Sequence, residues 1–316
     1  MENYIEKYLD SLSDDVRVID VSNKNLNYLP DLSRFKILEK LFCDGNNLTT
    51  LSILPENLKV LYCSNNNLTS LPILPKKLET LSCPYNKLTS LPVLPENLKE
   101  LFCYYNKLTS LPILPENLKE LSCHYNNLIS LPILPKNLKW LYCYDNKLIS
   151  LPILPENLRE LYCFHNKLTS LPILPKNLKW LNCSNNKLTS LSILPVNLKW
   201  LNCSNNKLTS LPVLPKNLKW LYCYNNKLTS LPVLPKNLKE LLFYGNPIYE
   251  IIYNNDLNIV NKKIKILNNF RYLYYCLKYR KRFFKMMEPI IKKRYHPSYL
   301  YDLKEDDDLD KKLGEW

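Results

Sequence analysis

The sequence predicts a solenoid in which short parallel β-strands stack from one unit to the next. Three features indicate this: a twenty-residue period without insertions from Leu41 to Leu241, apolar residues that alternate along each expected strand, and paired prolines after it. We expect a parallel β-sheet on the concave face, an extended or polyproline-like convex side, and small α-helical caps at the ends.

Each unit repeats one pattern of inward and outward side chains. In the unit around Leu61, the spacing L-x-x-L-x-L-x-x-N/C-x-L is filled by Leu58, Leu61, Cys63, Asn66 and Leu68. Because neighbours on a strand point to opposite faces, Leu61 and Cys63 are expected inside, with residues 60, 62 and 64 outside.

An Asn recurs in each unit after the expected strand. Its amide can both donate and accept hydrogen bonds to backbone groups that the turn leaves unpaired, so we predict a structural Asn ladder along the stack. The ladder consists of Asn46, Asn66, Asn86, Asn106, Asn126, Asn146, Asn166, Asn186, Asn206, Asn226 and Asn246.

The motif L-P-x-L-P-x-x-L-x-x-L-x-x-x-x-N-x-L-T-S resembles the bacterial-type leucine-rich repeats of effectors secreted by pathogenic bacteria. The resemblance covers residues 36 to 248 or so and implies a leucine-rich-repeat solenoid, or horseshoe. The inward Cys and the AT-rich type of composition are more similar to repeat proteins encoded by giant DNA viruses of amoebae. Some bacterial relatives carry a ubiquitin-ligase domain with a Cys-x-Asp motif, whereas here Cys276 is followed by Leu277 and Lys278.

The chain is expected to have three segments: an N-terminal helical cap at 1–15, a solenoid of about twelve units at 16–250, and a helical basic segment with an acidic tail at 251–316. The spacing of Ile5 and Leu9 is typical of one face of a short helix. Within the last segment, residues 262–294 hold twelve Lys or Arg and a single acidic residue.

Ten Cys, from Cys43 to Cys223, recur every twenty residues at an inward position. Adjacent strands, about 4.8 Å apart, are within disulfide range, but parallel side chains hold the Cβ atoms too far apart, so we expect free thiols. The Cys spacing is not of the kind that binds zinc. A Gly-rich phosphate loop is also absent, since the chain has 3 Gly. We therefore expect no enzyme, metal, cofactor or small-molecule substrate.

Outward aromatic residues are the predicted binding site for a protein partner, because Trp and Tyr dominate interaction hot spots. The predicted set is Trp140, Tyr142, Tyr144, Tyr162, Phe164, Trp180, Trp200, Trp220, Tyr222 and Tyr224. Further aromatic and polar residues lie beside them, at Tyr104, Tyr105, His124, Tyr125, Asp145 and His165. The alternative is that Tyr follows codon bias and that outward rings only stabilise the sheet. Trp has a GC-rich codon, so this bias does not explain it.

The formal net charge of +14 favours an acidic partner, although Lys-rich codon bias weakens that argument. Lys precedes each of the four outward Trp residues, which indicates either a solvated face or an acidic partner.

A second hypothesis is that 262–294 binds nucleic acid or an anionic membrane surface. The charged N-terminus and the lack of a long apolar run predict no signal peptide and no transmembrane segment, hence a cytoplasmic protein, in the host cytoplasm if viral. In that case the partner is expected to be a host protein.

Overall fold

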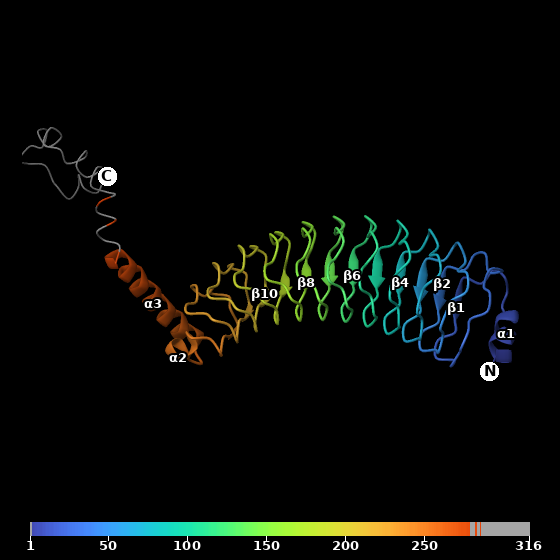
Figure 1. Cartoon of the computed structure of the whole chain (residues 1–316), viewed down its shortest axis with the longest axis horizontal. Coiled ribbons are helices and arrows are strands. Elements are labelled where there is room, and N and C mark those ends of the chain that lie inside the picture. Colours follow the sequence, from blue (N-terminus) through green and yellow to red (C-terminus); the bar gives the residue numbers. More distant parts are fainter. Residues whose placement is uncertain (1, 279–281, 283–284, 286–316) are drawn as a thin grey trace, which may run out of the picture. The chain divides into compact units, whose positions relative to one another are not determined.

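A computed structural model describes residues 2–278, 282 and 285. The chain divides into two compact units, Met1–Asn261 and Lys262–Trp316. The first unit is a stack of similar coils that follows a short helix, α1 (Glu2–Asp10) (Figure 1). The predicted solenoid with a parallel sheet is confirmed.

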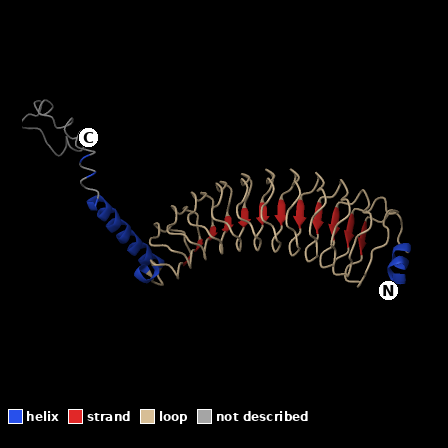
Figure 2. Cartoon of the chain, in the orientation of Figure 1, coloured by secondary structure: helices blue, strands red, loops and turns tan. Residues whose placement is uncertain are grey.

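One sheet runs through the first unit, and each of its strands is three residues long (Figure 2). Among the described residues, twelve parallel strands pair in sequence order. They are β1 (Val18–Asp20), β2 (Lys40–Phe42), β3 (Val60–Tyr62), β4 (Thr80–Ser82), β5 (Glu100–Phe102), β6 (Glu120–Ser122), β7 (Trp140–Tyr142), β8 (Glu160–Tyr162), β9 (Trp180–Asn182), β10 (Trp200–Asn202), β11 (Trp220–Tyr222) and β12 (Glu240–Leu242). From β2 onward, each residue pairs with the one twenty positions away, for example Leu41 with Leu61.

The core is a set of columns that the inward residues build along the stack. Leu58, Leu61, Cys63 and Leu68 are each 0% exposed, and their equivalents repeat this burial as far as the unit around Leu221. Strands of three residues are too short to be stable alone, so the burial of apolar side chains between neighbouring units must hold the array together. The ten Cys of this column are buried and free, as predicted.

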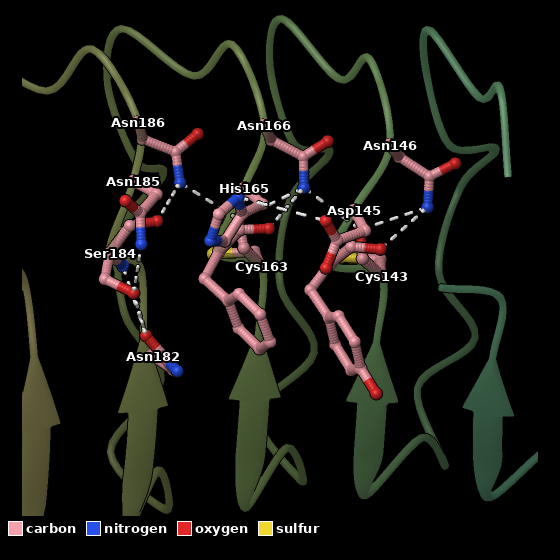
Figure 3. A network of polar contacts seen from close by, with 12 residues as sticks. Cys143, Asp145, Asn146, Cys163, His165, Asn166, Asn182, Ser184, Asn185 and Asn186 are labelled. Atoms are coloured by element: carbon pink, nitrogen blue, oxygen red, sulfur yellow. Dashed lines mark hydrogen bonds and ion pairs between the residues drawn. The ribbon is translucent and has the colours of Figure 1, made fainter. Parts of the chain in front are cut away.

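The Asn ladder ties each coil to the preceding one. The side-chain amide of Asn66 donates to the carbonyl of Cys43 at 2.9 Å and to that of Cys63 at 3.3 Å, and its Oδ1 accepts from the backbone N–H of Leu48 at 3.0 Å. Figure 3 shows the same arrangement at Asn146, Asn166 and Asn186. Each such Asn therefore satisfies backbone groups that the turn would otherwise leave buried and unpaired.

A second Asn ladder, which was not predicted from the sequence, lies three residues before the strands. Asn97 and its equivalents donate from Nδ2 to the carbonyl of the residue 21 positions earlier, Lys76 in this case, at 2.9 Å. The same bond is made by Asn57, Asn117, Asn137, Asn157, Asn177, Asn197, Asn217 and Asn237. Its sequence signal is the Asn that precedes the Leu78-type residue in nearly every unit.

Helix α1 closes the N-terminal end of the stack. Ile5 and Leu9 of this helix are buried. Glu6 accepts a hydrogen bond from the hydroxyl of Tyr28, and the guanidinium of Arg34 donates to the carbonyl of Leu9. The helix therefore covers apolar surface that the first coil would otherwise expose.

After β12 the chain becomes helical, with α2 (Tyr249–Ile252) and α3 (Leu257–Lys278). Asp256 caps α3, because its carboxylate accepts from the backbone N–H of Asn258 at 2.8 Å. The helical segment predicted within 251–316 is described as far as Lys278, with residues 282 and 285 also helical; 279–281, 283–284 and 286–316 lie outside the described residues. Among the described residues, none of the helices is both long and apolar enough to cross a membrane.

Candidate functional site

The strand face consists of the outward residues of the strands, the residue before each strand, and the two residues that follow the inward Cys. Seven of the predicted site residues lie within strands, and Tyr144, Phe164 and Tyr224 follow β7, β8 and β11. Two stretches of this face differ in charge: residues 41–160, here called the mixed-charge region, and residues 161–239, called the lysine-tryptophan region. On the strand face the first has six acidic and five basic residues; the second has four Lys and no Asp or Glu.

Three of the predicted Trp residues lie side by side on β9, β10 and β11. Trp200 pairs with Trp180 on one side and with Trp220 on the other. Trp140 stands apart on β7, because Glu160 occupies the equivalent position of β8. All four indoles are half-buried, so each combines a packed ring with a solvent-facing part.

The ring of Trp200 packs between two Tyr rings. Its centroid lies 6.1 Å from that of Tyr162, nearly parallel, and 5.8 Å from that of Tyr222, edge to face. Tyr142 extends the cluster, with its centroid 5.4 Å from that of Tyr162. The short side chains Asn182 and Asn202 occupy the two strand positions between Tyr162 and Tyr222, which leaves these Tyr rings room to lean towards Trp200.

Lysines lie over the remaining indoles. The Nζ of Lys199 is 5.9 Å from the ring centroid of Trp180, and those of Lys219 and Lys239 are 6.0 and 5.8 Å from that of Trp220. These are cation–π distances. Carboxylates flank the Trp row on both sides, because Glu160 pairs with Trp180 and Glu240 pairs with Trp220, and Glu240 accepts a hydrogen bond from the hydroxyl of Tyr222 at 2.9 Å.

Two oriented amides complete the lysine-tryptophan region. The Oδ1 of Asn182 accepts from the hydroxyl of Ser184 at 2.8 Å, and that of Asn202 accepts from the hydroxyl of Ser204 at 2.7 Å. With its oxygen held in this way, each amide turns its Nδ2 donor away from the Ser, as Figure 3 shows for Asn182. The sequence analysis missed both residues; their signal is the repeated Asn-Cys-Ser.

Two stacked aromatic columns run along the mixed-charge region, and the first ends at Phe164, in the first unit beyond it. The first joins Tyr104, His124, Tyr144 and Phe164, with centroid separations of 4.4, 4.2 and 4.2 Å. The second joins Tyr85, Tyr105 and Tyr125 at 4.5 and 4.1 Å. The predicted binding set contains only Tyr144 and Phe164 of these columns. Tyr224 lies outside them and stacks on Tyr244 at 4.6 Å.

The second column has an unusual backbone. Tyr85, Tyr105 and Tyr125 have φ values of 52°, 50° and 51°, a left-handed conformation that bulky side chains rarely adopt. Asn or Gly takes this position in the units around residues 45, 65, 185, 205, 225 and 245. Ring stacking is the interaction available to offset this strain.

Titratable groups of the mixed-charge region are perturbed mainly by burial. Burial lowers the pKa of His124 to about 4, and its Nδ1 lies 3.1 Å from the hydroxyl of Ser122. Burial, followed by the charges of Glu100 and Glu160, raises the pKa of the Glu120 carboxyl. Asp145 and His165 approach to 3.9 Å beside a shallow groove of about 640 Å³ along the turn edge.

The thiols of the Cys ladder are expected to be unreactive. Burial raises the pKa of Cys83, Cys123 and Cys183 to about 12, so their thiols stay protonated at neutral pH. Among the described residues, His, Cys, Asp and Glu form no group of three that is able to hold a metal ion. The arrangement suits recognition by charge, hydrogen bonds and aromatic contacts.

Comparisons with known proteins agree with this architecture. A family model described as Leucine Rich repeats (2 copies) matches residues 56–96, and one described as Leucine Rich Repeat matches 177–196 and 197–216. No curated protein sequence matches the chain.

Several solved structures are similar. YopM from Yersinia enterocolitica WA-314 is 41% identical with a TM-score of 0.69, over 71% of this chain and 49% of that one. YopM from Yersinia pestis, described as a leucine-rich effector protein, is 34% identical with a TM-score of 0.56, over 73% and 78%. The functional domain of InlJ from Listeria monocytogenes, described as including a cysteine ladder, is 31% identical with a TM-score of 0.71, over 78% and 57%. The chain thus spans about half the length of the first of these.

Proposed function

This chain belongs to the leucine-rich-repeat proteins, and on that premise we propose that it is a non-enzymatic module that binds an acidic protein partner on its concave strand face. The observation that carries the proposal is the lysine-tryptophan region, where a row of three Trp lies beside four strand-face Lys and carboxylates occupy only the flanking strand positions, Glu160 and Glu240. The four Lys are Lys179, Lys199, Lys219 and Lys239. Repeat proteins of this class use extended surfaces to bind other proteins.

Each component of the region suits a different part of an acidic polypeptide. The ammonium groups over Trp180 and Trp220 attract carboxylates, and the field of a basic surface speeds encounter with an acidic partner. The half-buried indoles offer apolar area of the kind that dominates binding hot spots. The Nδ2 donors of Asn182 and Asn202 are oriented to bond carboxylate or backbone oxygens.

The likeness to an effector protein of Yersinia pestis, together with the resemblance to repeat proteins of giant DNA viruses, makes a host-cell protein the proposed partner. The proposed place of action is accordingly the cytoplasm of that host. The viral source and this location are predictions from sequence, and identification of the captured partner tests both.

The test is capture of partners from host-cell extract by the full chain, followed by mass spectrometry and zero-length crosslinking of Lys to carboxylate. The triple variant Trp180→Ala, Trp200→Ala, Trp220→Ala is expected to lose the partners that the unchanged chain captures, with crosslinks mapping to Lys199 and Lys219 in the unchanged chain. A double variant on α3, Phe270→Ala with Tyr272→Ala, is the matched control and should keep them. Retention of the same partners by the triple variant, with an unchanged circular dichroism spectrum, would contradict the proposal.

A second candidate function rests on α3. This helix contains no acidic residue, and it exposes Ile266, Phe270 and Tyr272 close to Lys262 and Lys265. Such a combination of basic and aromatic residues suits nucleic acid or an anionic membrane surface. Binding of the full chain to RNA or to phosphatidylserine vesicles that weakens steeply with salt, and that is lost in the α3 double variant, would favour this function.

A further inference from the structure

A row of exposed β-branched residues follows the return segments, far along each coil from the strand. Ile73 is 90% exposed, and seven further members are 85–88% exposed. The row consists of Ile53, Ile73, Val93, Ile113, Ile133, Ile153, Ile173, Ile193, Val213 and Val233. We call it the Ile/Val row.

Folding does not account for this row. The neighbouring residues Leu71 and Leu74 fill the core, whereas Ile73 between them points to solvent. Other exposed positions of the same coil are polar, such as Thr69 and Ser70. An apolar residue at the same exposed position of ten consecutive units forms a row of the kind that marks an interaction site.

A column of charged residues runs beside the row. Glu56 and Lys76 line the same cleft as Ile53 and Ile73, which places this column at the edge of the row. The column contains Glu56, Lys76, Glu96, Glu116, Lys136, Glu156, Lys176, Val196, Lys216 and Lys236, all exposed. Acidic residues dominate its first half and Lys its second half, so the column has opposite charge at its two ends.

We propose that the Ile/Val row is the interface with a second copy of this chain, with the two rows antiparallel about a two-fold axis between Ile133 and Ile153. This two-fold axis lies in the plane of the interface and is perpendicular to the rows. Rotation about it reverses the direction of the second row and places the two charged columns opposite each other. Lys136 then faces Glu156 of the partner subunit.

The same two-fold rotation determines which residues of the two charged columns face each other. Glu116 faces Lys176 of the partner subunit, and Glu56 faces Lys236 of the partner subunit. Glu96 faces Val196 of the partner subunit, which is apolar. Lys76 faces Lys216 of the partner subunit, and this is the one like-charge pair. A parallel arrangement would instead place each charged column against the Ser and Thr column of the other copy, which leaves the carboxylates without cations. Charge therefore selects the antiparallel dimer.

The row is also large enough. A fully exposed Ile or Val side chain offers on the order of 100 Å² of apolar area, and the ten members are 50–90% exposed, so the row offers at most about 800 Å² in each copy. A standard stable interface buries about 800 Å² on each partner. The row lies outside the strand face, so a dimer formed in this way leaves the lysine-tryptophan region free for a partner.

The first experiment measures the mass of the full chain by sedimentation velocity over a range of concentrations. We expect a dimer that the double variant Ile133→Asp with Ile153→Asp converts to a monomer, because four carboxylates would meet at the axis. The matched control, Ile129→Asp with Ile149→Asp, changes exposed Ile residues of the same units outside the row and should remain dimeric. A monomeric unchanged chain, or a dimer that survives the row variant, would overturn the proposal.

The second experiment tests the orientation by exchanging charges. Glu116→Lys places two like-charge contacts in each dimer and should raise the dissociation constant roughly tenfold. Adding Lys176→Glu to the same chain restores both pairs, so dimerisation should recover. If the exchanged chain dimerises no better than the single variant, the antiparallel arrangement is wrong. Circular dichroism of each variant establishes that the coil itself is intact.

Discussion

The mixed-charge region and the lysine-tryptophan region share one core and differ in their outward residues. Both stack Leu, Cys and Asn in the same columns, with the same hydrogen bonds from the Asn ladder. In the first region Lys99 pairs with Glu79 at 2.6 Å, whereas in the second Lys199 lies over Trp180. The twenty-residue period therefore specifies the fold, while the positions that vary between units carry the specificity.

The turn positions of the two regions differ in the same way. In the mixed-charge region Tyr105 accepts a left-handed backbone and stacks on Tyr85 and Tyr125. In the lysine-tryptophan region Asn205 occupies the equivalent place with φ of 52°, a conformation that Asn tolerates well. The aromatic columns thus depend on ring stacking between consecutive units, whereas the Asn turns can be joined by a hydrogen bond, as Asn225 Nδ2 donates to Asn205 Oδ1 at 2.9 Å.

The largest effect on stability is expected where the two regions are alike. Asn126→Ala and Asn186→Ala each remove the amide that bonds buried backbone groups in two coils, so each should lower the free energy of unfolding by about 3 kcal/mol. Urea denaturation measures both. Asn177→Ala in the second ladder, which loses one exposed bond, should cost only about 1 kcal/mol. A clear difference between the losses of unfolding free energy in Asn126→Ala and Asn186→Ala would contradict the view that the two regions have equivalent cores.

Exchanging Tyr and Asn at the turn positions should change the stability of the two regions by different amounts. Asn205→Tyr introduces a strained left-handed Tyr between Asn185 and Asn225, with no ring to stack on in this column, and should destabilise the chain by about 1–2 kcal/mol. Tyr105→Asn relieves strain but loses two stacked contacts, so its net effect should be smaller. Thermal unfolding of the two variants measures this difference, and equal losses would mean that stacking does not offset the strain.

A pH effect should be confined to the mixed-charge region. The pKa of His124 is lowered to about 4 by burial among Tyr104, Tyr144 and Ser122, so the unfolded chain binds more protons than the folded one between about pH 6.5 and 4. The contribution to stability is full above pH 6.5 and falls, by an amount on the order of 1 kcal/mol, as the pH drops through this range. His124→Phe keeps the stack and should reduce the slope of unfolding free energy against pH; an unchanged slope would contradict the assignment.

The smallest effect is expected at Ser192, which replaces the first Pro of its return segment. Its buried hydroxyl has no hydrogen-bond partner among the described residues. Ser192→Pro removes that group and stiffens the unfolded chain, so it should raise the free energy of unfolding by about 0.5–1 kcal/mol. Ser52→Pro is the matched control and should gain less, because it loses the bond from the Ser52 hydroxyl to the carbonyl of Pro30. A gain at Ser52 equal to that at Ser192 would contradict this reasoning.

The sequence predicts the fold well because Leu61, Cys63 and Asn66 recur at fixed spacing, and spacing alone decides which side chains point inward. It also places Trp180, Trp200 and Trp220 on neighbouring strands. The contacts of those rings were not predictable, since a ring at 200 reaches Tyr162 and Tyr222 rather than the other indoles. Side-chain rotation decides such contacts, and periodicity carries no information about it. The second Asn ladder was missed although it has the same period.

The most direct test of the central claim compares charge reversal in the two regions. A labelled peptide that alternates Glu and Leu is titrated against the full chain and against two double variants, Lys199→Glu with Lys219→Glu and Lys99→Glu with Lys119→Glu. We predict that the first variant weakens binding by about a hundredfold and that the second changes it by less than about threefold, because Lys99 is already paired with Glu79. Equal losses in both variants, or no loss in the first, would contradict binding of an acidic partner by the lysine-tryptophan region.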